Sequence, residues 1–320
     1  MNLKIQDKTL IVLLSCFVFI GLLGALKPVL FNGGSSLAKY FAKQKQLEMV
    51  QEKNVEEYME SALFGDGSET LEVDGPVYSE AERTEAINII FQYDSFIAVT
   101  LFILSLLLFV PKILEKYHLY HILIPISLWL LCLSIGSMLN GGKRYSELAI
   151  LAHATRWGLP LVLWLVFYMK KKGHNILENK VVYTTAIICS SLTFAVHGWE
   201  AFNLNPPFQD LIYRFTSLIG INLPESVNFG ILRAVGCMDL VLAAVIFFFH
   251  KPKIFLWMAF WGIITAFSRP LTMGFDAWPE LAMRIANCAI PLGLFLIFKT
   301  QKQAVVEPEL NNQKMEMIYE

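Results

Sequence analysis

The sequence predicts an all-α integral membrane protein whose eight transmembrane helices form two four-helix halves. The first observation is composition: 55% of the 320 residues are hydrophobic and only 17% are charged, which is less charge than a soluble chain carries. The second is a series of apolar runs near the roughly 20 residues that a helix needs to cross a bilayer core. The third is that basic clusters recur after every second run.

Lysine-rich short loops mark the cytoplasmic side of a membrane. The clusters are Lys4/Lys8, Lys112/Lys116, Lys170–Lys172 with Lys180, Lys251/Lys253, and Lys299/Lys302. Because the chain can cross twice between consecutive clusters, all of them can lie on one side. We therefore expect a bacterial cytoplasmic (inner) membrane protein with both termini in the cytoplasm. The net charge of −1 argues against a nucleic-acid partner, and the apolar runs make the lipid bilayer the expected partner.

The spans follow in order along the chain. The first helix occupies residues 1–27, with its apolar centre at about 9–26. The rest of the first half is 94–169, with spans at about 94–111, 119–140 and 148–169. The second half is 180–298, with spans at about 181–201, 227–249, 254–269 and 280–298. Residues 299–320 are polar and predict a cytoplasmic tail without regular structure.

The segment 28–93 is acidic and is predicted to lie outside the cell. It contains twelve acidic and five basic residues, a net charge of 5 − 12 = −7. Ser35 or Ser36 can cap an amphipathic helix at its start, and Gly65-Asp66-Gly67 would end that helix. Residues 70–77 then read as a short extended piece. A segment of this length makes a small extracytoplasmic cap and no sizeable core of its own.

An internal repeat supports the division into two halves. Residues 153–167 align without gaps on residues 284–298, with Pro160 on Pro291 and apolar positions matched. Gly24 in the first span can likewise match Gly198 in the fifth. Because each half has an even number of spans, the two halves would share one topology in the membrane.

The cysteines give no sign of disulfide, thiol-relay or metal chemistry. All five lie within apolar spans and none forms a C-x-x-C pair: Cys16, Cys132, Cys189, Cys237 and Cys288. Leu13-Leu14-Ser15-Cys16 resembles a bacterial lipoprotein cleavage box, but the chain stays apolar through Leu26. We therefore expect an uncleaved first span without lipid on Cys16. No closed metal site is predicted, and thiolate ligands are missing.

Ionisable residues inside spans are costly and usually face a protein interior. His153/Arg156, His197/Glu200 and Arg284/Asn287 are spaced i, i+3, and Glu280/Arg284 i, i+4, so each pair shares one helix face. On the expected topology these pairs lie in the outer third of the bilayer. Asp239 lies nearer mid-depth.

These stripes predict one polar pocket near the outer surface. Its candidate ligand-binding residues are Arg233, Arg284, Asn287, His153, Arg156 and Arg269, because arginine suits planar oxyanions and carbonyl groups. The candidates for proton transfer are Asp239, Glu200 and His197. We expect Glu200 and Asp239 to pair with Arg233, Arg269 or Arg284. A network of ion pairs that only joins the helices is the alternative, as is a haem held by His153 and His197.

The second half resembles the DoxX/DoxD-like family of four-helix membrane proteins. The residues that carry the resemblance are His197-Gly198-Trp199-Glu200-Ala201-Phe202, Phe208–Ile212, Gly220–Pro224, Arg233–Leu240 and Met283–Asn287. Asp239 stands where the family has a glutamate. Ala201 departs from the family, which often has a lysine there. In the first half, Lys27 lies three residues after Gly24, which fits that pattern better.

The resemblance implies a four-helix architecture and links to quinone-coupled sulfur oxidation and to membrane complexes that handle oxidative stress. Together with the predicted pocket, it suggests an accessory or quinone/oxyanion-binding subunit of a membrane redox system. The cofactor stays unknown, with a quinone as the candidate, since no covalent cofactor motif is present. A membrane or extracytoplasmic redox partner is the candidate source of the electron carrier. Whether the chain is itself an enzyme stays open. The alternatives are a small-anion transporter and a scaffold that presents the 28–93 cap to a partner.

Overall fold

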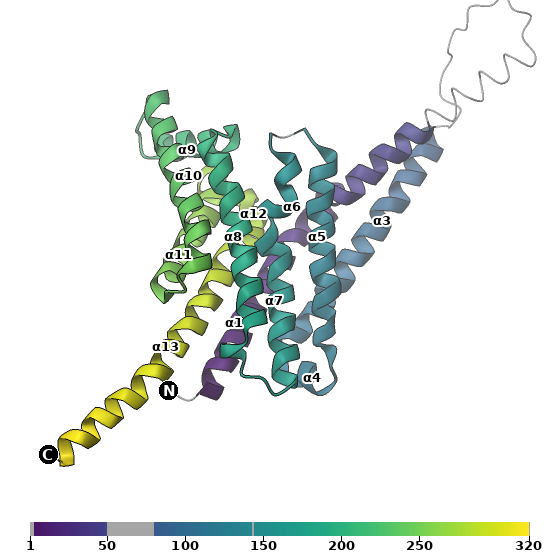
Figure 1. The fold of residues 1–320 in the computed structure, drawn as a ribbon. Coiled ribbons are helices and arrows are strands. Elements are labelled where there is room, and N and C mark those ends of the chain that lie inside the picture. The colour runs from purple at the N-terminus through teal and green to yellow at the C-terminus, as the bar shows by residue number, and fades with distance from the viewer. Residues whose placement is uncertain (1–2, 50–79, 143, 320) are drawn as a thin grey trace, which may run out of the picture.

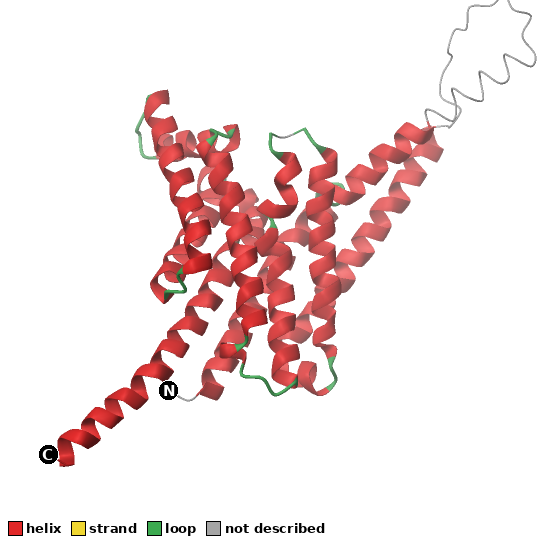
Figure 2. Ribbon diagram, viewed as in Figure 1, coloured by secondary structure: helices red, strands yellow, loops and turns green. Residues whose placement is uncertain are grey.

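The structure, a computed structural model, describes residues 3–49, 80–142 and 144–319. These residues form helices and connecting loops, and they contain no strand (Figure 2). Eight helical segments among them are long and apolar enough to cross a membrane. The chain is therefore an all-α multi-pass membrane protein, as the composition and the apolar runs predict.

The first half opens with α1 (Leu3–Phe31), which crosses the bundle from the N-terminal end. A second helix covers 36–49, and α3 (Glu80–Ser105) returns. The predicted cap at Ser35 is confirmed, because the backbone N–H of Ala38 donates to its Oγ at 3.1 Å. The Asp94 carboxylate then fixes this turn by accepting from the Ser35 N–H at 2.7 Å and its hydroxyl at 2.8 Å.

The rest of the chain follows the predicted order closely. The first half continues through η1 (Leu106–Phe109), α4 (Pro111–Lys116), η2 (Leu119–Ile122), α5 (Leu123–Asn140), η3 (Ser146–Leu148), α6 (Ala149–Ala152) and α7 (Ala154–Lys171). The second half contains η4 (Ile176–Glu178), α8 (Lys180–Phe202), α9 (Pro206–Leu218), α10 (Glu225–Phe248), α11 (Pro252–Met273), η5 (Phe275–Ala277), α12 (Trp278–Arg284) and α13 (Ala286–Tyr319).

Two boundaries differ from the prediction. Helix α3 begins at Glu80, well before the expected span at 94, because residues 80–93 contain no glycine or proline to stop it. The tail expected to lack structure is wrong as well: α13 continues to Tyr319, through a stretch rich in residues that favour helices. The predicted end at Gly65-Asp66-Gly67 and the extended piece at 70–77 lie outside the described residues.

The lysine-rich ends of the helices collect at one end of the bundle (Figure 1). Lys170 at the end of α7 forms a salt bridge with Glu115 of α4. The side chain of Gln301 in α13 donates to the Leu177 carbonyl, between α7 and α8. His250, after α10, stacks on Phe298 of α13 with ring centroids 5.1 Å apart. The arrangement required by the basic clusters is therefore present, and the face of the membrane on which this end lies stays a prediction.

The repeated segments share an interruption of the helix. Helix α6 ends at Ala152 and α7 begins at Ala154, with His153 between them. Helix α12 ends at Arg284 and α13 begins at Ala286. In the alignment of the repeat, His153 corresponds to Arg284, so the two breaks fall within one residue of each other. At each break a polar residue of the repeat lies just before the long helix: His153 before α7 and Arg284 before α13.

Small residues let the helices of the second half approach closely, as is common in membranes. A Cβ on Gly236 of α10 would lie 2.5 Å from the Phe202 nitrogen and 2.7 Å from the Gly198 oxygen of α8. A Cβ on Gly198 would lie 3.0 Å from the Cβ of Asp239. This contact brings Asp239 to the level of Gly198, near the end of α8.

A chain of buried hydrogen bonds joins the two halves at the centre. The Thr155 N–H of α7 donates to the Thr193 Oγ1 of α8 at 3.0 Å. The Thr155 hydroxyl donates to Asn287 Oδ1 of α13 at 2.6 Å. All three side chains are buried. These three central helices therefore form a polar seam between the halves.

Candidate functional site

A cavity of about 590 Å³ lies in the second half, between α8, α9, α10, α11 and the junction of α12 with α13. Its walls are mostly apolar and are contributed by Phe208, Leu211, Ile212 and Phe215 of α9, Ile231 and Val235 of α10, and Ile264, Phe267 and Leu271 of α11. A pocket of this size and character is typical of sites for small organic ligands.

The open side of this cavity lies among α9, α10 and α11. Phe267 and Leu271 line the cavity and are 53% and 58% exposed, and Phe215 and Ile231 are exposed as well. Helices α10 and α11 are two of the membrane-spanning helices, so their exposed apolar faces contact lipid. A ligand can thus enter this cavity sideways, from the hydrocarbon region, without passing through the bundle.

The inner end of the cavity carries buried polar groups that make no hydrogen bond of normal geometry. Asp239 is 6% exposed and Arg269 is 8% exposed, and both line the cavity. The Asp239 Oδ1, the Arg269 Nε and the Trp261 Nε1 lack such a bond among the described residues, although Trp261 lies within interaction range of Asp239 and the Arg269 Nε lies 3.9 Å from the Glu280 Oε2. Buried polar groups are normally hydrogen-bonded, and each exception calls for an explanation. A ligand with its own donors and acceptors would provide one.

The depth of Asp239 differs from the sequence-based expectation of mid-depth. Its position beside Gly198 puts it level with His197, the preceding residue of α8. Helix α10 begins only after α9 has passed over the end of α8, so its first turns project beyond the neighbouring helix (Figure 1). Fourteen residues into α10 therefore corresponds to the outer part of α8.

His197 and Glu200 form the pair predicted from their spacing. The His197 Nδ1 lies 3.0 Å from the Glu200 Oε2, and the side chains are 23% and 12% exposed. Phe208 of α9 covers this pair and its arginine neighbour. Its ring centroid lies 6.1 Å from that of His197 and 5.9 Å from the Arg269 guanidinium carbon. Helix α9 thus closes the polar end of the cavity with an aromatic ring.

Neither Glu200 nor Asp239 forms the expected ion pair with an arginine within 4.0 Å among the described residues, although Glu200 lies within electrostatic range of Arg269. Glu280 is the carboxylate that pairs with the arginines. Its Oε2 accepts a hydrogen bond from Arg284 Nη1 at 2.6 Å and lies 3.9 Å from Arg269 Nε. The i, i+4 spacing puts Glu280 beside Arg284 on one helix face, and α12 brings both to the end of α11. Asp239 consequently remains without an arginine.

The structure divides the predicted pocket residues into two places. The second-half cavity brings together His197, Asp239, Arg269, Arg284 and Asn287, and Glu200 adjoins it through His197. His153 and Arg156 line a different cavity, of about 410 Å³, in the first half. A haem shared by His153 and His197 is incompatible with this separation. Arg233 is exposed on α10 and lines neither cavity.

Two residues at or beside the site were not found from the sequence, and Phe208 was found only as part of a stretch that carries the family resemblance. Trp261 lies in a stretch that the sequence shows only as apolar, and nothing in its spacing distinguishes it. Thr155 directly precedes Arg156 in the predicted polar stripe. Thr155 could have been predicted as a polar contact, because it is a small hydroxyl residue next to a charged residue within a span.

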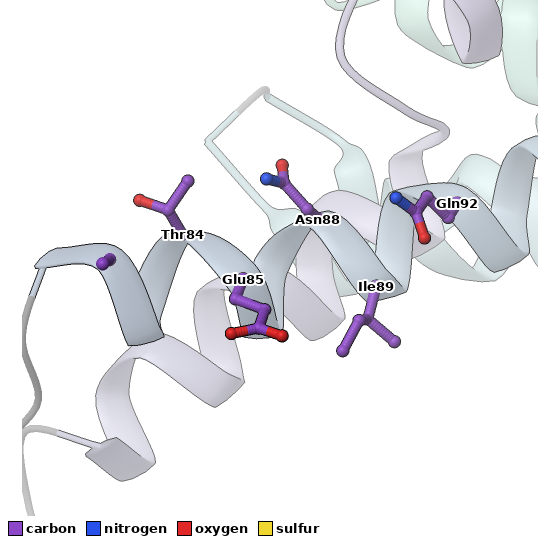
Figure 3. Close-up of a pocket in the computed structure, with 6 residues that line it drawn as sticks. Thr84, Glu85, Asn88, Ile89 and Gln92 are labelled. Carbon is purple, nitrogen blue, oxygen red and sulfur yellow. The ribbon is translucent and has the colours of Figure 1, made fainter.

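A third hollow lies on the part of α3 that extends beyond the bundle. Figure 3 shows its lining residues on a single helix, with Thr84 and Asn88 on one side and Glu85 and Ile89 on the other. A surface of this kind encloses nothing, so it offers no ligand the desolvated contacts of the two internal cavities.

No cluster of three or more histidine, cysteine, aspartate or glutamate side chains suited to a metal ion occurs in the described parts of the chain. No protein-family model, curated protein or solved structure matches this sequence.

Proposed function

We propose that the second-half cavity binds the headgroup of a quinone, and that the protein is an accessory subunit of a membrane redox system. One observation carries the proposal. At the closed end of an apolar cavity open toward lipid, a carboxylate, an indole N–H and a guanidinium N–H are buried without a hydrogen bond of normal geometry among the described residues. An amphiphile with an oxygen-bearing head and an apolar tail would satisfy all three.

The polar groups complement both redox forms of such a headgroup. The carbonyl oxygens of a quinone accept hydrogen bonds, and Trp261 and Arg269 can donate them. The hydroxyl groups of a quinol donate, and the Asp239 carboxylate can accept them and take up a proton. His197, held by Glu200, stands at the same end as a second proton acceptor. A partner protein would supply the electron carrier, because the sequence contains no covalent cofactor motif.

The resemblance to the DoxX/DoxD-like family supports this proposal. Its distinctive residues in this chain, His197-Gly198 and Asp239, lie together at the polar end of the cavity. The family has a glutamate at the position of Asp239, so a carboxyl group is what the resemblance leads us to expect there. The close contact of Gly198 with α10 positions that carboxyl group.

A scaffold that presents the acidic cap is the competing proposal, and residues 50–79 of that cap lie outside the described residues. The two can be separated, because a scaffold requires nothing of Asp239 or Arg269. A variant without residues 50–79 should retain bound quinone if the cavity is the functional part of the protein.

The test is to measure quinone in the purified protein. The protein is purified in a mild detergent from quinone-containing membranes, and extracted quinone is measured by mass spectrometry. Asp239→Asn and Arg269→Gln each remove one partner of a headgroup oxygen. A hydrogen bond to a charged group contributes about 1.5–3 kcal/mol, so we expect each variant to bind at least about tenfold less tightly.

Arg233→Gln is the matched control, because Arg233 is an exposed arginine of α10 outside the cavity. It should retain as much quinone as the wild type. The proposal fails if the wild-type protein neither copurifies with quinone nor binds a short-chain quinone on titration, or if Asp239→Asn and Arg269→Gln bind it as the control does. Its redox part fails if quinol oxidation by membranes is the same with and without the two cavity variants.

A further inference from the structure

The first half contains its own cavity, which has a different chemical character. Its volume is about 410 Å³, and it lies between α1, residues 34–39, α5 and α7. Small residues of α1, including Gly21 and Ala25, make room for it, and Phe17, Leu130 and Leu159 form part of an apolar wall. The cavity can therefore hold an acyl chain as well as a polar group.

The charged and ionisable side chains that line this cavity are all basic. They are Lys39, His153 and Arg156, and no aspartate or glutamate is among the described residues of the lining. The remaining polar residues are Ser35, Ser36, Ser134, Ser137 and Asn140. In contrast to the second-half cavity, which includes Asp239, this one therefore offers positive charge without a carboxylate.

Arg156 is the centre of the inference. Its guanidinium has no hydrogen bond or ion pair with any described residue, although it is largely enclosed by helices α1, α5 and α7. It lies within electrostatic range of Arg284 and Arg269, which repel it, and of Glu280. Glu280 is already bonded to Arg284 at 2.6 Å. An enclosed guanidinium with five N–H donors and no acceptor is costly, and an anion in the cavity would remove that cost.

The carboxylate of Asp94, which contacts the cavity-lining Ser35, is already engaged. Both oxygens of Asp94 accept hydrogen bonds from Ser35, one from its N–H and one from its hydroxyl, at 2.7 and 2.8 Å. The serines also donate elsewhere: Ser36 to the Leu133 carbonyl at 2.5 Å and Ser137 to the same carbonyl at 3.0 Å. The free donors of the cavity are thus concentrated at Arg156 and at Lys39 on its rim.

We propose that the first-half cavity binds the phosphate of an anionic membrane amphiphile, with Arg156 as the principal contact and Lys39 at the entrance. A guanidinium matches two phosphate oxygens with two parallel N–H bonds, and the apolar wall accommodates the start of an acyl chain. This site shares no lining residue with the quinone cavity, although Arg156 lies within electrostatic range of Arg284 and Arg269, which line that cavity. A free phosphate ion has the same recognition chemistry, so the experiment must distinguish the two sources.

The experiment measures binding of three probes to the purified full-length protein in a neutral detergent. Dioctanoyl phosphatidylglycerol carries the phosphate and the chains, dioctanoylglycerol carries only the chains, and inorganic phosphate carries only the anion. We expect the phosphatidylglycerol to bind and dioctanoylglycerol to bind at least about tenfold more weakly. Arg156→Gln should reduce the affinity for phosphatidylglycerol by about tenfold or more, because it removes one charge-assisted hydrogen bond.

Two further variants keep the result interpretable. Arg233→Gln removes an exposed arginine outside both cavities and should leave binding unchanged. Lys39→Glu changes an exposed side chain, so it should fold even if Arg156→Gln does not, and a carboxylate at the entrance should also reduce binding of the anionic lipid. Displacement of the lipid by millimolar inorganic phosphate, lost in the Arg156 variant, would identify the free ion as a ligand of the same site.

The inference is overturned if phosphatidylglycerol and dioctanoylglycerol bind equally well and inorganic phosphate does not bind. It is also overturned if Arg156→Gln is folded and keeps the wild-type affinity. Should Arg156→Gln fail to fold, unchanged binding in Lys39→Glu overturns it instead. The quinone content of the same preparations shows whether the second-half cavity is intact, so failure of one proposal can be told from failure of the other.

Discussion

Gly236→Ala should push α10 away from α8 and thereby disturb the quinone cavity. The new Cβ would lie 2.5 Å from the Phe202 nitrogen, 2.7 Å from the Gly198 oxygen and 2.8 Å from the Phe202 Cα, all of them backbone atoms. Ordinary contact begins at 3.4 Å, so the closest contact must lengthen by 3.4 − 2.5 = 0.9 Å. Neither backbone can relieve this by a side-chain rotation.

The free energy of unfolding should fall by about 1–2 kcal/mol. Overpacking of a well-packed interface costs about 1–3 kcal/mol, and the lower backbone entropy of alanine in the unfolded chain offsets about 0.5–1 kcal/mol. Asp239 lies one turn along α10 from Gly236, so the shift should also move its carboxyl group and reduce the bound quinone. Denaturant unfolding in detergent and quinone extraction measure the two effects.

Gly230→Ala is the matched control on the same helix. A Cβ on Gly230 would have no atom within 4 Å, so only the gain in helix propensity remains, and stability should be unchanged or higher by up to about 1 kcal/mol. Equal stability of Gly236→Ala and the wild type would refute the close helix contact. Equal losses in both alanine variants would show that the effect comes from alanine and not from the interface.

Two other substitutions test the polar contacts of the bundle. Glu280→Gln leaves Arg284 and Arg269 without their carboxylate and should lower the free energy of unfolding by about 1–3 kcal/mol, as measured with denaturant. The loss is smaller than for a fully buried ion pair because Glu280 is 39% exposed. A loss below about 0.5 kcal/mol would show that solvent already screens the pair. Thr155→Val removes the buried donor to Asn287 and should cost about 1 kcal/mol, whereas Thr272→Val, whose hydroxyl bonds only within its own helix, should cost less. Equal effects of the two valines would contradict the seam between the halves.

The fold was largely predictable, because crossing a bilayer imposes strong requirements on sequence. Uninterrupted apolar runs predicted the positions of most spans to within a few residues. The basic clusters predicted that successive spans run in opposite directions. Ser35 was predictable as a helix cap because a serine hydroxyl at that position satisfies a free N–H. The start of α3 and the extent of α13 were not, because hydropathy marks where a helix leaves the apolar region and says nothing about where the helix ends.

The site was predictable in composition and not in arrangement. Periodicity and topology place His197, Arg269, Arg284 and Asn287 at one depth, and the structure brings these four to one cavity. Depth does not determine direction around the helix axis relative to neighbouring helices. Arg233 therefore turned out to be exposed, and Arg156 lines the other cavity. The choice of Glu280 over Asp239 as the arginines' partner depends on how α12 is placed, which no local pattern encodes.

The seam formed by Thr155, Thr193 and Asn287 bears on the alternative of anion transport. Alternating access requires one bundle to rock against the other around a central substrate. Here buried hydrogen bonds join α7, α8 and α13, and rocking of one half against the other would have to break them. At about 1 kcal/mol each, these bonds oppose such a motion, whereas the opening of the second-half cavity toward lipid offers a ligand a route that does not require it.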